Sequence, residues 1–154
     1  MITLSPTQWE TYLRLRTRRY ADSVLKFDPG HPVLSIKQEK EFWDKEVEKG
    51  LHLIWDIIYK KSKTIGFIHA FNFEHSICET GISILFHKYR NRGCGYAAYQ
   101  VLFHILKHMD ISSTYIWTNT LNIPAIALYK KLGYTSAETQ IQDEVTWSKY
   151  TRRM

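Results

Sequence analysis

The chain has 154 residues, 44% of them apolar and 23% charged, which is the composition of a globular domain and excludes a disordered chain. Its 21 lysines and arginines exceed its 15 acids, and the formal net charge of +6 is compatible with an anionic partner. The only cysteines are Cys78 and Cys94, which excludes a disulfide-rich scaffold.

The sequence contains no apolar run near the roughly 20 residues that a membrane-spanning helix needs. No basic segment followed by an apolar stretch stands at the N-terminus, where a secretory signal would have one. There is also no internal repeat, linker or low-complexity segment. We therefore expect one domain, residues 1–154, located in the cytoplasm.

Two helices are expected in the first third of the chain, after a short strand near the N-terminus. Residues 5–8, Ser-Pro-Thr-Gln, have the capping-box pattern with proline at the first helical position, which predicts a helix from there to about Tyr20. Ser35 and Gln38 repeat the capping pattern and predict a second helix that ends at Gly50.

Three strands and a long helix are expected in the middle of the chain. Residues 51–59 and 64–73 are rich in β-branched and aromatic residues and are joined by a short lysine-rich turn, which predicts an antiparallel hairpin. Residues 77–86 are expected to extend that sheet. Apolar residues recur at helical spacing over 95–109, which is the clearest helix of the sequence.

The last third of the chain is expected to contain a strand at 113–118, a helix at 123–132 closed by Gly133, and a strand pair at 135–141 and 145–150. The element order is therefore strand, two helices, three strands, helix, strand, helix and two strands. This order predicts a mixed α/β domain.

The most informative segment passes from an apolar strand through a basic, glycine-containing turn into the long helix. Gly93 and Gly95 allow consecutive backbone N–H groups to converge, and the helix N-terminus adds unpaired donors and a partial positive charge. Arg90 and Arg92 can supply full charges. The segment therefore predicts an anion site. It does not match the dinucleotide-binding pattern, because position 98 is alanine rather than glycine, and the ATP-binding loop pattern is absent.

Two motifs together resemble the GNAT superfamily of N-acetyltransferases. Residues 90–95, Arg-Asn-Arg-Gly-Cys-Gly, are similar to the family's pyrophosphate motif, with Asn91 at a position where glycine is common. Residues 122–134 are similar to its second signature, an asparagine followed by a helix with a tyrosine, with Tyr134 in place of the usual phenylalanine. The resemblance covers nearly the whole chain. It implies an α+β fold of order β-α-α-β-β-β-α-β-α-β-β, with a central, mostly antiparallel sheet flanked by helices on both faces.

The resemblance also implies acetyl-CoA as co-substrate and a role for each matching residue. Backbone groups of residues 83–85 would pair with the pantetheine arm, as if adding a strand at a splayed sheet edge. The N–H groups of residues 91–96 would hold the pyrophosphate. The implied cofactor-binding residues are Ser83, Ile84, Leu85, Arg90, Asn91, Arg92, Gly93, Cys94, Gly95, Tyr96, Asn122 and Tyr129. No metal is expected.

The implied reaction is direct attack of a primary amine on the thioester in a ternary complex. An amine with a lysine-like pKa is mostly protonated at neutral pH, so a base is needed. Glu79, on the strand that leads to the turn, is the chosen base, with Glu74, His69 and His75 as open alternatives. Tyr129 would protonate the departing thiolate, and a strand N–H near Leu85 would stabilise the oxyanion. Tyr129 as a mere packing residue stays an alternative.

The acceptor is not determined by the sequence, and a small amine, an antibiotic and a peptide or protein amine all fit. We expect it between the first two helices and the final hairpin, where aromatic residues and a glutamate would suit a cation. The candidate lining residues are Trp9, Tyr20, Phe27, Trp43, Trp147, Glu41, Glu79 and Glu144.

The cluster of arginines at 14–19 and the net charge leave one alternative function, a basic, non-catalytic nucleic-acid-binding domain. Nucleic acid and membrane are not expected as partners of the enzyme itself. His104 and His108 have the spacing of a metal pair without a neighbouring glutamate, and Cys94 as a nucleophile lacks a matched histidine and acid. A homodimer stays open, since two-fold dimers are the commonest soluble oligomers.

Overall fold

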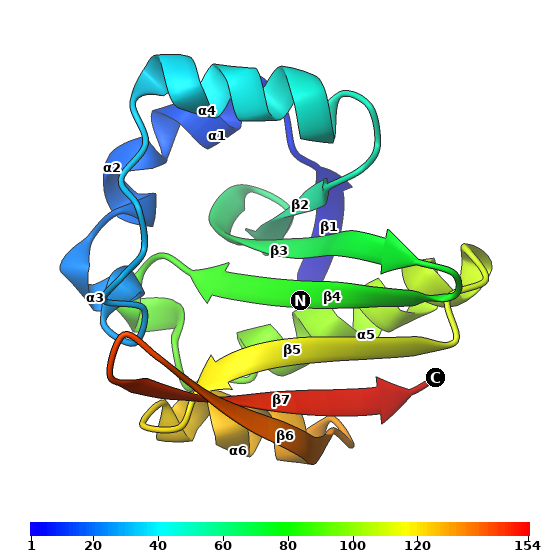
Figure 1. The fold of residues 1–154 in the computed structure, drawn as a ribbon. Helices are drawn as coiled ribbons and strands as arrows, with labels where there is room; N and C mark the ends of the chain where they lie inside the picture. Colours follow the sequence, from blue (N-terminus) through cyan, green and yellow to red (C-terminus); the bar gives the residue numbers. More distant parts are fainter.

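The computed structural model describes residues 1–154 and contains one seven-stranded sheet of order β1-β2-β3-β4-β5-β7-β6 (Figure 1). The strands are β1 (Ile2–Pro6), β2 (Leu53–Tyr59), β3 (Lys63–Glu74), β4 (Ile77–Ile84), β5 (Ser113–Asn119), β6 (Thr135–Gln142) and β7 (Val145–Arg153). The helices are α1 (Trp9–Arg14), α2 (Arg16–Arg19), α3 (Asp22–Leu25), α4 (Ile36–Phe42), α5 (Cys94–His108) and α6 (Ile123–Lys131). A π-helical turn, Trp43–Val47, continues α4, and a 3₁₀ turn, His87–Tyr89, follows β4.

The sheet is antiparallel except between β4 and β5, and these two strands separate along their length. Their parallel ladder pairs only residues 77–79 with residues 113–115. Beyond Glu79, β4 stays paired with β3 as far as Ile84, and β5 stays paired with β7 as far as Asn119. The facing edges of β4 and β5 therefore carry backbone groups without a strand partner, next to the turn that leads into α5.

Both faces of the sheet are covered, because successive side chains of a strand point to opposite faces. Phe67 of β3 packs with Leu15 and Trp43, in a small cluster on the side of α1 and α4. Its neighbour Ile68 belongs to the large cluster that α5 and α6 form with the other face. The α+β fold with a mostly antiparallel sheet and helices on both faces is confirmed.

The expected start of the first helix is wrong. Ser5 and Pro6 are the last residues of β1, and the helix begins at Trp9 after Gln8, whose side chain makes no capping hydrogen bond. The chain stays with the sheet through Thr7, whose N–H donates to the carbonyl oxygen of Ile54. Pro6 fits there because β1 is an edge strand, where a missing N–H costs nothing on the open side.

The predicted first helix is also interrupted at Leu15, which separates α1 from α2, and a short α3 that the sequence did not indicate follows. The second capping box is confirmed, since Ser35 Oγ accepts from the Gln38 N–H and Gln38 Oε1 accepts from the Ser35 N–H. The remaining elements differ from the predicted ranges by a few residues at their ends. None of the helices combines the length and apolarity that crossing a membrane requires.

Candidate active site

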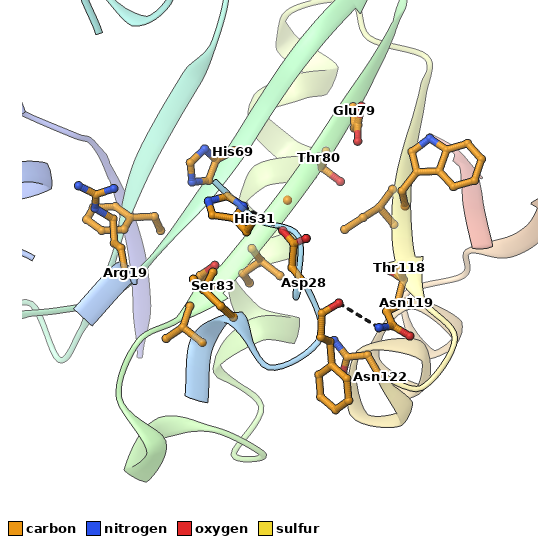
Figure 2. A pocket seen from close by; sticks show the side chains of 18 of the residues that line it. Arg19, Asp28, His31, His69, Glu79, Thr80, Ser83, Thr118, Asn119 and Asn122 are labelled. Carbon is orange, nitrogen blue, oxygen red and sulfur yellow. Dashed lines mark hydrogen bonds and ion pairs between the residues drawn. The ribbon is translucent and has the colours of Figure 1, made fainter. Parts of the chain in front are cut away.

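A cavity of about 360 Å³ opens where β4 and β5 separate (Figure 2). Residues 79–83 and Leu85 of the β4 segment form one wall, and residues 116–119 of β5 form another. Asn122 and Tyr129 line it from the start and the inner face of α6, and the segment after α3 crosses its mouth with Phe27, Asp28 and His31. Asn119 Nδ2 donates to the carbonyl oxygen of Phe27, which ties this segment to β5.

The turn between β4 and α5 presents a run of free backbone donors. The N–H groups of residues 91–96 donate to no carbonyl or side chain of the protein, and the first donor of α5 that is satisfied is Ala97, at the Gly93 carbonyl oxygen. Helix α5 has 15 residues, so its dipole adds a partial positive charge at the same place. Consecutive free N–H groups at a helix N-terminus are the donor set that a phosphate group requires.

The turn depends on backbone conformations that few residues adopt. Gly93 has φ +80° and Asn91 has φ +56°, and asparagine tolerates this left-handed region better than most residues. Gly95 is required for another reason, since a Cβ there would lie 3.2 Å from Leu128 Cδ2 of α6. The departure at position 91 from the family pattern is therefore accommodated by the backbone.

The Arg90 side chain forms hydrogen bonds within the protein, whereas the Arg92 side chain is exposed on the turn. Arg90 Nε donates to the carbonyl oxygen of Ile84 at 3.0 Å, and Nη1 donates to that of Ser23 at 3.3 Å. Arg90 thus joins the end of β4 to α3. Of the two arginines expected to provide charge to an anion, only Arg92 is free to do so in this arrangement.

The open edge of β4 is formed by Ile84 rather than by its two neighbours. The N–H of Leu85 donates to Ile65 on β3, and the carbonyl oxygen of Ser83 points at Gly66 of β3, where an added Cβ would lie 2.0 Å from it. Since C=O and N–H point in opposite directions in a trans peptide, the Ile84 N–H and C=O face away from β3. By the two-residue period, those of Ile82 do so as well. Leu85 N–H therefore cannot stabilise an oxyanion.

The oxygen and the nitrogen of the Asn122 side-chain amide have different surroundings. Its Oδ1 accepts from the Ala125 N–H at 3.3 Å and caps α6, while its Nδ2 donates to no protein atom and the side chain lines the cavity. The amide group can therefore donate to a ligand without losing the cap.

Tyr129 is 4% exposed, within a cluster of tyrosines that includes Tyr99 and Tyr134, and it also lines the cavity. Burial raises the pKa of the Tyr129 hydroxyl, and the side chains of Thr118 and Tyr99 lower it only in part. The hydroxyl therefore keeps its proton over the physiological range. Tyr129 therefore packs in the core and also lines the cavity.

Glu79 lies on β4 at the last pair before the strands separate, and its side chain lines the cavity. Burial raises the pKa of the Glu79 carboxyl, while hydrogen bonds from Asn72 and Tyr115 and the charge of Lys149 lower it in part. A carboxylate with a raised pKa inside a cleft has the property of a general base. Glu74, the last residue of β3, and His75, in the β3–β4 turn, do not line the cavity.

His69 lines the cavity but lacks the basicity of a proton acceptor. Its Nδ1 lies 2.8 Å from Nε2 of His52. Burial lowers the pKa of His69 to about 3 and that of His52 to about 4, so both rings are neutral at physiological pH. Of the four candidates for the base, Glu79 alone both lines the cavity and has a pKa raised above its ordinary value.

Two of the four arginines at 14–19 are paired within the protein. Arg19 donates to both carboxylate oxygens of Glu39 at 2.8 and 3.0 Å, and Arg16 Nε lies 3.4 Å from the same carboxylate. The Tyr20 hydroxyl donates to it as well. Glu39 is 2% exposed, so Arg16 and Arg19 are directed at a buried carboxylate, whereas Arg14 and Arg18 are exposed.

The acceptor end of the cavity is lined by residues from elements far apart in the sequence. Tyr20, Phe27 and Trp147 take part as expected, whereas Trp9, Trp43, Glu41 and Glu144 do not. Sequence reasoning missed Asp28, His31, Phe71 and Trp117, which also line it. No spacing pattern in the sequence could have indicated them, because they come from three separate segments. No group of three or more histidine, cysteine or acidic side chains is placed to hold a metal ion.

Comparison with known proteins agrees with this geometry. A family model described as the acetyltransferase (GNAT) family matches residues 9–134. Comparison with curated proteins found no match. A spermidine N-acetyltransferase from Vibrio cholerae, in complex with CoA and spermine, has a TM-score of 0.88 at 12% identity, over 99% of this chain and 95% of that one.

Two further solved structures share the fold. A domain from Methanocaldococcus jannaschii DSM 2661 has a TM-score of 0.86 at 14% identity, over 100% of this chain and 99% of that one. The aminoglycoside acetyltransferase AAC(6')-Ib, in complex with coenzyme A, has a TM-score of 0.83 at 10% identity, over 99% of this chain and 95% of that one.

The match over most of the chain shows that the protein belongs to the acetyltransferase (GNAT) family. Acetyl-CoA is the co-substrate in this family, so the chain is an acetyl-CoA-dependent N-acetyltransferase.

Proposed function

We propose that the protein transfers the acetyl group of acetyl-CoA to a primary amine by direct attack in a ternary complex. The observation that carries the proposal is the run of free N–H groups at residues 91–96, beside the open edge of β4 and the cavity that Tyr129 and Glu79 line. These donors fit a diphosphate, and the backbone of Ile82 and the N–H of Ile84 face the open edge, where the pantetheine arm can pair with them, while the Ile84 carbonyl oxygen accepts from Arg90. Arg92 adds a positive charge at the turn.

The proposed steps balance as an acyl transfer. Glu79 accepts a proton from the acceptor ammonium, directly or through water, and the neutral nitrogen forms a bond to the thioester carbon. The N–H of Ile84 or Ile82 donates to the carbonyl oxygen as it gains charge. The carbon–sulfur bond then breaks, the thiolate receives a proton from Tyr129, and the nitrogen gives its second proton, through water, to the Tyr129 oxygen, so that amide, thiol and neutral tyrosine result. The Nδ2 of Asn122 donates to the cofactor arm.

The charges around the cavity favour a cationic acceptor. Asp28 and Glu79 supply carboxylates, whereas the only arginine of the lining, Arg19, is paired with Glu39. Aromatic faces such as that of Trp147 suit a cation as well. Two structural neighbours are named for spermidine and aminoglycoside acetylation, which supports an amine acceptor of this kind.

Calorimetric titration with acetyl-CoA tests the first half of the proposal, and the absence of binding at millimolar ligand would contradict it. Thiol release is then measured with three amines of equal length, 1,5-diaminopentane, 5-aminopentanol and 5-aminopentanoate. We expect kcat/KM to fall in that order, and preference for the carboxylate-bearing amine would contradict the cationic acceptor.

Two substitutions test the assigned roles. Glu79→Gln is expected to lower kcat by about 10²- to 10⁴-fold, the usual contribution of a general base. Tyr129→Phe is expected to lower kcat far more than it weakens acetyl-CoA binding, because the lost hydroxyl acts on the departing sulfur. Unchanged turnover in either variant would remove that residue from the mechanism.

A further inference from the structure

Strand β3 is irregular where it passes Glu79. The β3–β4 ladder runs without interruption from Gly66 to Phe71 and then shifts register before Glu74. Asn72 lies within this shift with φ +50°, a left-handed conformation that only a small fraction of non-glycine residues adopt. Bulges of this kind re-aim a side chain and are frequent beside active sites.

The irregularity points the Asn72 amide across the sheet instead of along its own strand. Asn72 Nδ2 donates to Glu79 Oε2 at 2.8 Å. An asparagine that serves only as a turn former usually bonds its own nearby backbone. Here the amide bonds one oxygen of a carboxylate on the neighbouring strand instead.

We propose that Asn72 is a positioning residue, which fixes the orientation of the Glu79 carboxylate and favours its charged form. The inference rests on the proposed function in one respect, the role of Glu79 as the base. A donor on a carboxylate stabilises the ion relative to the neutral acid. Asn72 thereby opposes the effect of burial, so that Glu79 stays charged enough to accept a proton.

The other groups that face Glu79 come from β5 and β7. Tyr115, its partner in the parallel ladder, also provides a hydrogen bond, and Lys149 contributes a positive charge. Lys149 is not altered when position 72 is substituted, whereas Tyr115 also shares a hydrogen bond with the Asn72 side chain. A change in the titration of Glu79 on substitution of Asn72 therefore reports the loss of the amide together with any adjustment of Tyr115.

The test is a titration of Glu79 by ¹³C NMR in the full chain labelled at the glutamate carboxyl carbons, with the signal assigned through Glu79→Gln. Asn72→Ala removes the donor. Asn72→Gly removes it as well but suits the positive φ, so this variant keeps the fold without strain. Asn72→Asp replaces the donor by a second negative charge. We expect the midpoint to rise in all three variants, most in Asn72→Asp.

His75→Ala is the matched control. His75 has φ +56° in the β3–β4 turn, three residues after Asn72, but makes no hydrogen bond to Glu79. Its substitution is expected to leave the Glu79 midpoint unchanged. An unchanged midpoint in Asn72→Gly and Asn72→Ala, or an equal rise in His75→Ala, would overturn the proposal.

A kinetic measurement separates positioning from general damage. With any amine that the enzyme acetylates, the acid limb of the pH profile of kcat/KM should move to higher pH in Asn72→Gly. The rate is then several-fold lower at acid pH and recovers at alkaline pH, whereas a merely structural defect lowers it at every pH. If Glu79→Gln keeps full activity, the proposed base is wrong. The NMR titration tests the effect of Asn72 on the Glu79 carboxylate independently of that outcome.

Discussion

Two basic segments of the molecule differ in whether their hydrogen-bond donors and positive charges are paired within the protein. Arg14–Arg19 contains the densest cluster of arginines in the sequence, yet Arg16 and Arg19 are directed at Glu39, which lies 20 residues after Arg19. The turn at residues 90–96 has fewer cations, and its backbone N–H groups have no acceptor within the protein. The segment with less charge is therefore the better anion site.

The difference shows that a basic sequence becomes a ligand site only where the chain does not supply the counter-charge itself. At α2 the counter-charge is a buried carboxylate from α4, so the cluster joins two helices over the acceptor end of the cavity. At the turn the donors are main-chain groups whose orientation depends on the positive φ angles of Asn91 and Gly93, and no side chain of the protein accepts from them. Substitutions that remove the counter-charge or the backbone conformation should affect the two segments differently.

The largest effect is expected from Glu39→Gln, which leaves Arg19 without its ion pair. Burial acts to raise the pKa of Glu39, but hydrogen bonds from Arg19 and Tyr20 outweigh it and hold the pKa below its usual value. Breaking a buried pair by removing one partner costs about 3–5 kcal/mol. Urea denaturation at pH 7 measures this loss.

The pH dependence of the same variant follows from the lowered pKa. The stability that Glu39 contributes is present above its unfolded pKa of about 4.3 and is lost as the pH falls through the folded value. The difference between the native chain and Glu39→Gln should therefore shrink in acid. Asp44→Asn, at the exposed pair with Lys40, is the control, with an expected loss of about 0–1 kcal/mol. Equal losses in the two variants would contradict the role given to Glu39.

A smaller effect is expected from Gly93→Ala, measured as acetyl-CoA affinity by calorimetry. Alanine at φ +80° costs about 1–2 kcal/mol, and relief of that strain turns the N–H groups of the turn away from the ligand. We expect binding to weaken about tenfold or more. Gly133→Ala introduces a similar strain at φ +89°, after α6 and away from the turn. If Gly133→Ala weakened binding as much, the turn would have no special part in it.

The smallest effect is expected from Arg92→Ala, because the side chain is exposed and its charge is screened by solvent. Acetyl-CoA binding should weaken about two- to threefold, and less at high salt. Arg14→Ala removes an equally exposed arginine of the other segment and should leave the affinity unchanged. Matching losses in the two variants would mean that both segments contact the cofactor, which would remove the contrast between them.

The sequence predicted much of the fold where the signal is local. The capping box at Ser35, the long apolar stripe of α5 and the closing glycine of α6 each depend on neighbours within about one helical turn. The capping pattern at residues 5–8 does not start a helix, because Ser5 and Pro6 belong to β1 and the Thr7 N–H donates to the carbonyl oxygen of Ile54. Local preference determines an element only where no strand partner competes for the same backbone groups.

The sequence by itself predicted the turn as an anion site, the helix that follows it and the resemblance to the family, since glycines, a left-handed asparagine and a helix start act within seven consecutive residues. Only the tertiary structure decided that Ile84 rather than Leu85 faces the open edge, that Glu39 pairs with Arg16 and Arg19, and that Asn72 reaches Glu79. These facts depend on strand register and on packing between segments far apart in the chain, and no spacing along one segment encodes them.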